Sequence, residues 1–247
     1  MRYTDAPARR QELLDRLAAA GYVASADVAA ALGVSEMTIR RDLRRLADDG
    51  LARRVPGGAS LPDARGPEPF ETRSGSARPA KRALAEVAAA LLTESSTVAL
   101  DAGTTVAEIV DLVPEGVGVV THSLPVITAC AAAGGREVVA LGGFYEPTTR
   151  SFTGPATWNA VRELTVDVAV LSCSALDDRG VYSANPVDAE IKRALIEVAD
   201  RVVVLADRHK VGARAAVRFA APEAVHVVVT DADQELTAYA EVVRVDA

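Results

Sequence analysis

Several residue types and sequence features are scarce or absent in this chain, and each absence argues against a class of structure, such as a disulfide or a membrane-spanning segment. The two cysteines, Cys130 and Cys173, lie in apolar stretches typical of a helix and a strand, so we expect reduced thiols packed as small hydrophobic side chains rather than a disulfide. Residues 1–10 lack an apolar segment after their charges, and no later apolar run reaches membrane-spanning length without a charge or a turn residue. We therefore expect a cytoplasmic protein.

Lysine and histidine are also scarce. Of the 27 basic residues only three are lysines, Lys81, Lys192 and Lys210. An ammonium group is a compact charge that can approach one phosphate or hydroxyl oxygen, whereas a guanidinium group needs more room. We interpret Lys192 and Lys210 as candidate ligand contacts and leave Lys81 open, with solvated surface positions as the alternative. The three histidines show no metal-ligand spacing, so no metal site is predicted.

The composition is that of a soluble globular protein, with 49% apolar and 25% charged residues in a chain of 247. This length suits one large domain or a small domain joined to a larger one. The net charge of −7 is unevenly distributed: residues 1–60 carry ten arginines and eight acidic residues, whereas the remainder carries 17 basic and 26 acidic residues. Because DNA is polyanionic, a nucleic-acid contact is expected in the N-terminal part.

Residues 25–50, SADVAAALGVSEMTIRRDLRRLADDG, predict two short helices joined by a tight turn. Ser25 and Ser35 are suitable N-caps, and Gly33 allows the turn. In the second helix the apolar positions fall at i, i+4 and i+7 on one face, and four arginines occupy the opposite face. With the helix predicted over residues 8–20, this pattern is typical of a helix-turn-helix that enters the major groove.

The next residues, LARRVPGGASL at 51–61, predict a short hairpin that serves as a wing. We therefore predict an all-helical winged helix-turn-helix domain over residues 1–60 that binds double-stranded DNA. The alternative is a solvated, arginine-rich helix face on an ordinary protein. The residues expected to contact DNA are Ser35, Glu36, Thr38, Arg40, Arg41, Arg44, Arg53 and Arg54.

A linker is predicted over residues 61–79, because the sequence there is rich in proline and glycine and has little periodicity, although Phe70 is a candidate for packing. Residues 80–247 predict a larger, doubly wound, mostly parallel α/β domain. Its apolar runs TVAL, GVGVV, EVVAL, DVAVL, RVVVL and VHVVV are continuous rather than alternating, and helical segments separate most of them. In such sheets ligands bind beyond the carboxyl ends of the strands.

The stretch LDAGTT at 100–105 ends one predicted strand and precedes a helix predicted over residues 104–113. Gly103 would let the backbone turn with its N–H groups exposed, and the hydroxyls of Thr104 and Thr105 would add donors, so a phosphate fits this turn. An ordinary helix cap explains the same residues. The local sequence does not separate the two interpretations.

A further helix is expected to start at Asn185 and Pro186 and to carry Glu190 and Lys192. In a regular helix those two side chains diverge by about 200°, so they do not easily share one pocket. Asp188 lies four residues before Lys192 and offers an ion-pair partner on the surface as the alternative role of that lysine.

Eight stretches in order along almost the whole chain resemble the DeoR family of bacterial transcriptional regulators. They are LGVSEMTIRRDLRRLADDGLARRVPGGA, PFETR, LDAGTT, VVTHS, LGGFY, SFTGPA, AEIKRALI and LADRHKVG. The first is highly specific, LDAGTT and LADRHKVG are moderately so, and the short glycine motifs are weak alone. The resemblance implies an N-terminal winged helix-turn-helix and a C-terminal domain similar to sugar-phosphate isomerases, whose ligand is typically a phosphorylated sugar. It favours the phosphate interpretation of LDAGTT.

The resemblance, together with the residues above, gives the predicted effector site. Its residues are Asp101, Gly103, Thr104, Thr105, His122, Ser123, Glu190, Lys192, Asp207 and Lys210. The chain departs from the family pattern in the loop that starts at Ser172, where a glycine is common and this chain has none before Gly180. We therefore expect the ligand to approach this backbone less closely than in relatives.

The sequence thus predicts a DNA-binding repressor of sugar or carbohydrate metabolism genes that is controlled by a phosphorylated sugar. No catalytic residue and no cofactor are predicted. Expected partners are operator DNA, the sugar phosphate and further copies of the chain in a homodimer or higher assembly, because a palindromic operator needs two heads; no membrane partner is expected. One alternative is an isomerase-type enzyme with a DNA-binding domain, for which Asp101, Glu190 and Asp207 are available bases. Another is a second domain that only oligomerises.

Overall fold

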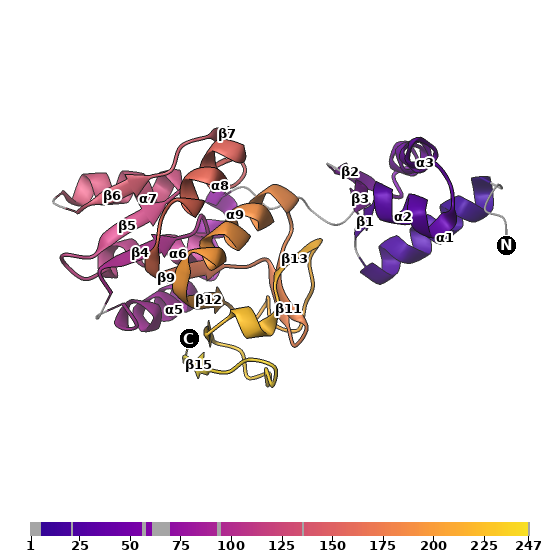
Figure 1. Cartoon of the computed structure of the whole chain (residues 1–247). Coiled ribbons are helices and arrows are strands. Elements are labelled where there is room, and N and C mark those ends of the chain that lie inside the picture. The colour runs from indigo at the N-terminus through magenta and orange to yellow at the C-terminus, as the bar shows by residue number, and fades with distance from the viewer. Residues whose placement is uncertain are drawn as a thin grey trace. The chain divides into compact units, whose positions relative to one another are not determined.

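The computed structural model describes residues 6–20, 22–55, 58–60, 70–92, 95–134 and 136–246, and the side chains of these except at 18–20, 22, 24, 53, 55 and 60. The chain divides into two compact units, Met1–Gly66 and Pro67–Ala247 (Figure 1).

The first unit combines three helices with a small antiparallel sheet. Its elements are α1 (Ala6–Ala20), β1 (Tyr22–Ala24), α2 (Ser25–Leu32), α3 (Glu36–Asp48), β2 (Arg53–Val55) and β3 (Gly58–Ser60). The turn between α2 and α3 contains Gly33 with φ +65°, a left-handed conformation that glycine adopts without strain. The predicted helix-turn-helix is therefore confirmed, and its helices enclose one apolar core around Leu13, Leu17 and Leu43.

The predicted wing is the hairpin of β2 and β3. The two strands pair antiparallel, with Arg53 opposite Ser60, while β1 pairs with the other side of β3. The strand order is β1-β3-β2, so the strand before α2 completes a sheet that the sequence predicted only as a hairpin. The hairpin tip at 56–57 and residue 61 lie outside the described residues.

The second unit is built on a seven-stranded parallel sheet. Its strands are β4 (Thr97–Leu100), β5 (Gly118–Thr121), β6 (Val138–Ala140), β9 (Val166–Ser172), β12 (Ala199–Ala206), β14 (Val227–Thr230) and β15 (Val242–Arg244). The order is β15-β14-β12-β9-β4-β5-β6. The chain therefore builds outward from β4 to one edge, returns to β9 and builds to the other. This reversal places the topological switch point, where doubly wound sheets bind ligands, between β4 and β9.

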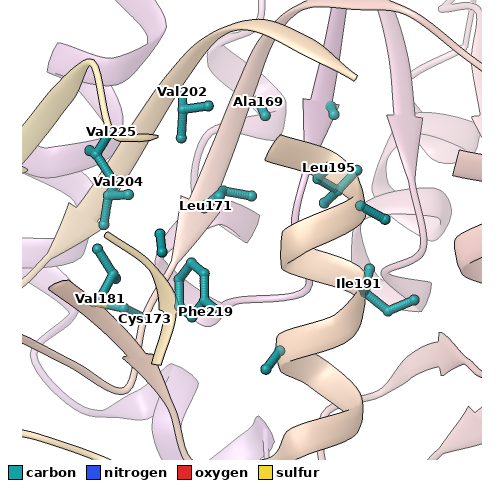
Figure 2. Packing of buried hydrophobic residues seen from close by; sticks show 14 of the residues in the cluster. Ala169, Leu171, Cys173, Val181, Ile191, Leu195, Val202, Val204, Phe219 and Val225 are labelled. Carbon is teal, nitrogen blue, oxygen red and sulfur yellow. The ribbon is translucent and has the colours of Figure 1, made fainter. Parts of the chain in front are cut away.

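Helices cover both faces of this sheet. They are α5 (Arg78–Ala90), α6 (Thr104–Ala107) and α7 (Leu124–Ala133) on one face and α8 (Pro155–Arg162) and α9 (Pro186–Glu197) on the other. Successive residues of the strands enter opposite cores. Val203 belongs to the core that α5 covers, whereas Val202 and Val204 belong to the core that contains Ile191 and Leu195 of α9. Figure 2 shows the second of these cores. Two buried faces explain why the strands are continuous apolar runs, and the predicted doubly wound domain is confirmed.

Smaller elements lie around the sheet. They are α4 (Phe70–Gly75), β7 (Phe144–Glu146), β8 (Ser151–Thr153), β10 (Ala175–Asp177), β11 (Gly180–Ser183), β13 (Val217–Ala220) and the 3-10 turns η1 (Val110–Leu112) and η2 (Pro222–Ala224). Strands β10, β11 and β13 form an antiparallel sheet, and β7 pairs with β8. Cys130 and Cys173 are buried and are not joined to each other.

Two predictions need correction. Of the predicted linker over 61–79, residues 61–69 lie outside the described residues, but residues 70–79 form α4 and the start of α5 and so belong to the second unit. The helix predicted over 104–113 is a single turn, α6, followed by η1. This stretch is rich in β-branched residues, which are poor helix formers, and packing into the core outweighs its helical periodicity.

Within the described part of the chain, none of the helices has both the length and the apolar character that crossing a bilayer requires.

Candidate functional site

Helix α3 has one buried and one exposed face. Its N-cap is Ser35, whose Oγ accepts a hydrogen bond from the Thr38 backbone N–H at 3.2 Å and lies 2.8 Å from Thr38 Oγ1. On the buried face Ile39, Leu43 and Leu46 are at most 2% exposed. The predicted cap and the predicted apolar face are confirmed. Because that face is buried, the arginines lie on the opposite, exposed face.

The exposed face of α3 carries guanidinium groups. Arg41 and Arg44 are exposed, and Arg40 pairs with Glu36 one turn earlier, with 2.6 Å between Nη2 and Oε1. Guanidinium groups on such a helix can reach phosphates and the guanine edge in the major groove. Arg41 and Arg44 are therefore accessible among the predicted contacts, whereas Glu36 and Arg40 already bind each other.

Two more residues belong to this surface. Met37, which the sequence reasoning missed, is 73% exposed on α3, where an apolar side chain can contact the thymine methyl group. Arg54 is exposed on β2, while the side chain of Arg53 lies outside the described residues.

A buried ion pair joins α3 to α1. Arg9 Nε donates to Asp42 Oδ2 at 2.5 Å, and the two side chains are only 4% and 5% exposed. This pair was not predicted from the sequence, because Asp42 stands between arginines in a helix that is mostly exposed. It fixes the helix that carries the basic face against the helix that supports it.

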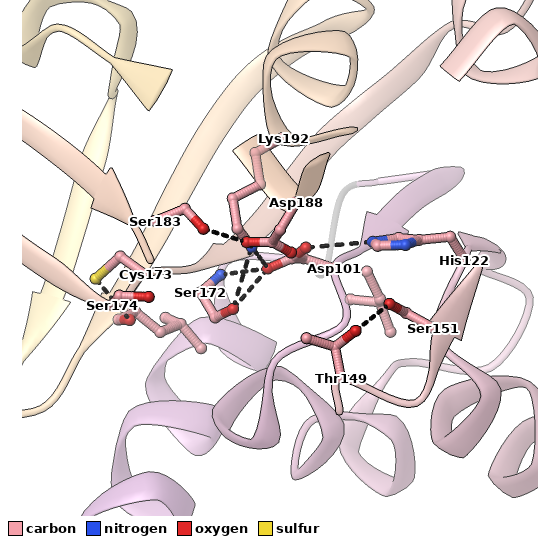
Figure 3. Close-up of polar contacts among 12 residues, drawn as sticks. Asp101, His122, Thr149, Ser151, Ser172, Cys173, Ser174, Ser183, Asp188 and Lys192 are labelled. Carbon is pink, nitrogen blue, oxygen red and sulfur yellow. Dashed lines mark hydrogen bonds and ion pairs between the residues drawn. The ribbon is translucent and has the colours of Figure 1, made fainter. Parts of the chain in front are cut away.

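At the switch point of the second unit, Asp101 is the centre of a buried polar cluster (Figure 3). Its Oδ2 accepts hydrogen bonds from the Ser172 backbone N–H at 2.9 Å, from Ser172 Oγ at 2.6 Å and from Lys192 Nζ. His122 Nε2 lies 3.3 Å from Asp101 Oδ1, and His122 Nδ1 lies 2.9 Å from the carbonyl oxygen of Phe152. One carboxylate therefore connects the ends of β4 and β9 with α9 and with His122.

The charges in this cluster stabilise one another. Burial raises the pKa of Asp101, but the Lys192 ammonium and His122 outweigh burial and hold that pKa well below its ordinary range. Burial lowers the pKa of Lys192, but the carboxylates of Asp101 and Asp188 outweigh it and raise that pKa. Both groups are charged near neutral pH, and the Asp101 carboxylate is a weak base.

Lys192 is not the surface residue that its neighbour Asp188 suggested. Its Nζ does lie 3.5 Å from Asp188 Oδ2, as the spacing of four residues predicts, but the lysine side chain is only 3% exposed. Asn185 caps α9 as expected, with its side chain accepting from the Val187 N–H at 2.9 Å. Glu190 pairs with Arg193 on a more exposed side of α9, so the predicted divergence of Glu190 from Lys192 is observed.

The LDAGTT turn is tightly packed. A Cβ atom on Gly103 would lie 2.1 Å from Ser172 Oγ, so the glycine is needed for the close approach of β9. Thr104 is 5% exposed and Thr105 is fully buried. Gly103 is thus packed against β9 rather than exposed, and the phosphate interpretation of this turn stays a prediction. The helix that follows has a single turn, and its dipole adds little for an anion.

The remaining predicted residues lie around this cluster. Ser123 is buried and caps α7, accepting from the Val126 N–H at 3.4 Å. Asp207 and Lys210 form their own pair at 3.4 Å between Oδ2 and Nζ. Cys173 lies near both lysines, and burial raises the pKa of its thiol to about 11, so it stays protonated and unreactive.

A cavity opens beside the Asp101 cluster at the carboxyl edge of the sheet. Its lining residues are Arg73, Ala102, Thr149, Ser172, Cys173, Ser174, Ser183, Ala184, Asn185, Asp188 and Lys192. Figure 3 shows Ser172, Ser183, Asp188 and Lys192 converging there. All ten residues predicted for the effector site are among the described residues, and of these Lys192 lines the cavity. Asp101 does not line it but binds the lining residues Ser172 and Lys192, and His122 contacts Asp101.

Several lining residues were missed or undervalued by the sequence reasoning. Arg73 belongs to the PFETR stretch and was given no role. Thr149 and Ser183 carried no signal of their own, because their positions depend on how the 147–150 turn and β11 fold back over the sheet edge. Asn185 was expected only as a helix cap. A set of two cations, four hydroxyls, an amide and a carboxylate suits a polyhydroxy anion.

Two family models match the chain: the DeoR-like helix-turn-helix domain over residues 9–65 and the DeoR C terminal sensor domain over residues 76–232. The chain belongs to the DeoR family. It is accordingly a DNA-binding transcription regulator, and the resemblance noted in the sequence is confirmed.

Relatives in this family are named as regulators. The chain is 36% identical over 203 residues to the transcriptional repressor AccR of Agrobacterium fabrum, covering 80% of this chain and 79% of that protein. It is 34% identical over 215 residues to the putative aga operon transcriptional repressor of Escherichia coli O157:H7, covering 85% and 80%. Ribose 5 phosphate isomerase A from Neisseria gonorrhoeae is a distant structural neighbour, with a TM-score of 0.40, 17% identity and coverage of 54% and 53%.

Proposed function

We propose that this chain represses sugar or carbohydrate metabolism genes and that a phosphorylated sugar in the cavity of the second unit controls its affinity for DNA. The observation that carries the effector proposal is the lining of the cavity, in which Arg73 and Lys192 supply positive charge and four hydroxyls, an amide and Asp188 supply hydrogen-bonding groups. Cations bind phosphate oxygens, and the uncharged groups suit sugar hydroxyls. The cavity also lies at the switch point of the sheet, where ligands of doubly wound domains bind.

The proposed division of labour follows the two units. Residues 1–60 bind operator DNA, and the second unit, to which Arg73 belongs, binds the effector. Because two heads spaced by about 34–36 Å match a palindromic operator, we propose a homodimer or higher assembly that acts on DNA in the cytoplasm.

We infer sensing without turnover. A base that abstracts a proton from a sugar carbon needs a pKa near the working pH. Lys192 and His122 hold the pKa of Asp101 well below its ordinary range. Glu190 is paired with Arg193, and Asp207 with Lys210. We therefore infer that none of the three candidate bases, Asp101, Glu190 and Asp207, acts as a general base.

A thermal-shift screen tests the effector proposal. The purified chain is heated with phosphorylated sugars, their unphosphorylated forms and inorganic phosphate. A ligand at 100 times its dissociation constant stabilises the folded state by about 2.7 kcal/mol, so a selective rise in Tm is expected from one phosphorylated sugar. Thr149→Val removes one cavity hydroxyl and should weaken that ligand by about three- to tenfold. Thr128→Val on the exposed side of α7 is the matched control. A Tm that no phosphorylated compound raises would contradict the proposal.

The DNA contacts have a separate test in the salt dependence of binding to a random-sequence duplex, measured by fluorescence anisotropy. Each arginine that neutralises a phosphate contributes about 0.9 to the slope of log K against log salt. We expect Arg41→Ala and Arg44→Ala each to reduce the slope by about that amount. Arg162→Ala, an exposed arginine of the second unit, should leave it unchanged. An unaltered slope in the Arg41→Ala/Arg44→Ala double variant would remove α3 as the DNA-binding helix.

A further inference from the structure

The effector cavity has little free space as it stands. The part that can hold water molecules measures about 40 Å³, inside an open hollow of about 380 Å³. Cavities that enclose small-molecule ligands measure about 300–1,000 Å³. A phosphorylated sugar can therefore be enclosed only if one wall of the cavity moves outward.

Two of the walls are firmly held. The ends of β4 and β9 are joined by the hydrogen bonds of Asp101 to Ser172. Lys192 stands on α9, whose Ile191 and Leu195 are at most 1% exposed in the core beside the sheet. Moving either wall would break buried charge contacts or disrupt the main core.

A further wall is held more loosely than these two. It consists of Arg73 on α4 and Thr149 in the turn 147–150. Helix α4 has six residues, of which only Phe70 is buried. A short helix with a single buried side chain has low local stability.

The two ends of α4 are attached differently. At its start, the Phe70 N–H donates to the Thr148 carbonyl oxygen at 3.0 Å, and the guanidinium groups of Arg73 and Arg150 lie 5.9 and 6.0 Å from the centre of the Phe70 ring. Arg150 itself has φ +51°, a left-handed conformation that strains a non-glycine residue. The docking site of Phe70 is therefore a strained turn.

At the other end, the buried ammonium of Lys81 donates to the carbonyl oxygens of Arg73 and Ser76, the latter at 2.7 Å. This lysine of α5 is 3% exposed and ties the end of α4 to the body of the second unit. The Phe70 end is held in addition by the ion pair of Arg150 with Glu71, at 3.3 Å between Nη1 and Oε1. That pair is exposed and therefore weaker than the buried contacts of Lys81, so the Phe70 end is the one that can move. In the chain, that end follows the segment that leads from the DNA-binding unit.

We propose that Arg73 is a direct effector contact and that α4 is the movable wall through which occupancy of the cavity is transmitted toward the DNA-binding unit. This inference rests on the proposed function. The Arg73 guanidinium group binds the phosphate through two parallel hydrogen bonds. The bound ligand displaces Phe70 from its contact with Thr148 and Arg150. The start of α4, at Phe70, thereby changes position.

Fluorine NMR of the full chain labelled with 4-fluorophenylalanine tests this inference, because the chain has only four phenylalanines. Phe70 reports on α4. Phe219 reports on the cavity, since Lys192 Nζ lies 5.7 Å from the centre of its ring. Phe144, which is 76% exposed, and Phe152 monitor the fold of each variant. Each signal is assigned by a Phe→Leu substitution, and the probes are ribose 5-phosphate, glycerol 3-phosphate and inorganic phosphate.

The expected result with at least one probe is a shift of both the Phe219 and the Phe70 signals. In Arg73→Met the Phe219 signal should still shift, at about tenfold or higher ligand concentration, while the Phe70 signal stays in place. Arg73→Lys, with a point charge in place of the guanidinium group, should show a smaller Phe70 shift, and Thr72→Ala on the exposed side of α4 should behave as the wild type.

The contrary outcomes are distinct. A Phe219 shift without a Phe70 shift in the wild type overturns the role of α4 and leaves the proposed function standing. A Phe70 shift that persists at unchanged affinity in Arg73→Met overturns the role of Arg73. A response of neither signal to any of the three probes contradicts the proposed function as well.

Discussion

Asp101→Asn is expected to lower the free energy of unfolding of the second unit by about 3 kcal/mol. The substitution removes the negative charge that neutralises Lys192, whose side chain is 3% exposed, and it weakens the acceptor for Ser172. Breaking one side of a buried ion pair leaves the other charge without compensation, which costs more than the pair itself contributes. Asp188, 3.5 Å from Lys192 Nζ, limits the loss. Urea denaturation of the full chain measures the effect.

A double-mutant cycle separates charge from packing. Lys192→Met alone should also destabilise, because Asp101 then lacks its main counterion. The double variant Asp101→Asn/Lys192→Met should recover much of the lost stability, since it removes both buried charges together. Asp200→Asn, on an exposed residue of β12, is the matched control and should change stability by less than about 0.5 kcal/mol. Strict additivity of the two single variants would show that the pair is not coupled.

The effect of Asp101 has a defined pH dependence. Because its pKa in the folded chain is held below the ordinary value, the unfolded chain binds the proton more readily. The stabilisation is therefore complete above about pH 5 and declines as the pH falls below about 4, the unfolded pKa of an aspartate. The stability difference between the wild type and Asp101→Asn should narrow in the same range.

Arg9→Met is expected to unfold the first unit or leave it only marginally stable. The variant buries the Asp42 carboxylate without the guanidinium that lies 2.5 Å from it, at a cost of about 3–5 kcal/mol. A unit of this size has a total stability of about 3–9 kcal/mol at the usual range per residue. Hydrogen–deuterium exchange of the full chain should show faster exchange throughout α3, and binding to duplex DNA should fall in parallel.

The control for this variant lies on the same helix. Arg16 pairs with Glu12 at 2.7 Å, but the side chains are 38% and 29% exposed, so Arg16→Met should cost less than about 1 kcal/mol. Arg9→Met/Asp42→Leu, which removes both charges, should restore protection of α3. Equal exchange rates in Arg9→Met and Arg16→Met would show that the buried pair does not hold α3 in place.

Much of the fold could be predicted because periodicity reflects which faces of an element are buried. Ile39, Leu43 and Leu46 recur at helical spacing, and the arginines of α3 therefore had to lie on the other face. The runs that became β4, β5, β9, β12 and β14 are continuous because both faces of the sheet are covered there. The run that became the edge strand β6 is apolar as well, although it is largely exposed. Strand β15 was missed because its apolar run is only two partly buried valines, followed by the exposed Arg244.

The sequence by itself thus determined the two kinds of domain, the basic helix and the edge of the sheet at which the site lies. Only the tertiary structure decided which side chains meet there. Asp101 and Lys192 are 91 positions apart, and Gly103 is required by Ser172 on another strand. Arg73 and Thr149 line the cavity because α4 folds onto the 147–150 turn. Spacing along one element encodes the face on which a residue lies, whereas its partners on other elements depend on strand order and packing, which the whole chain fixes together.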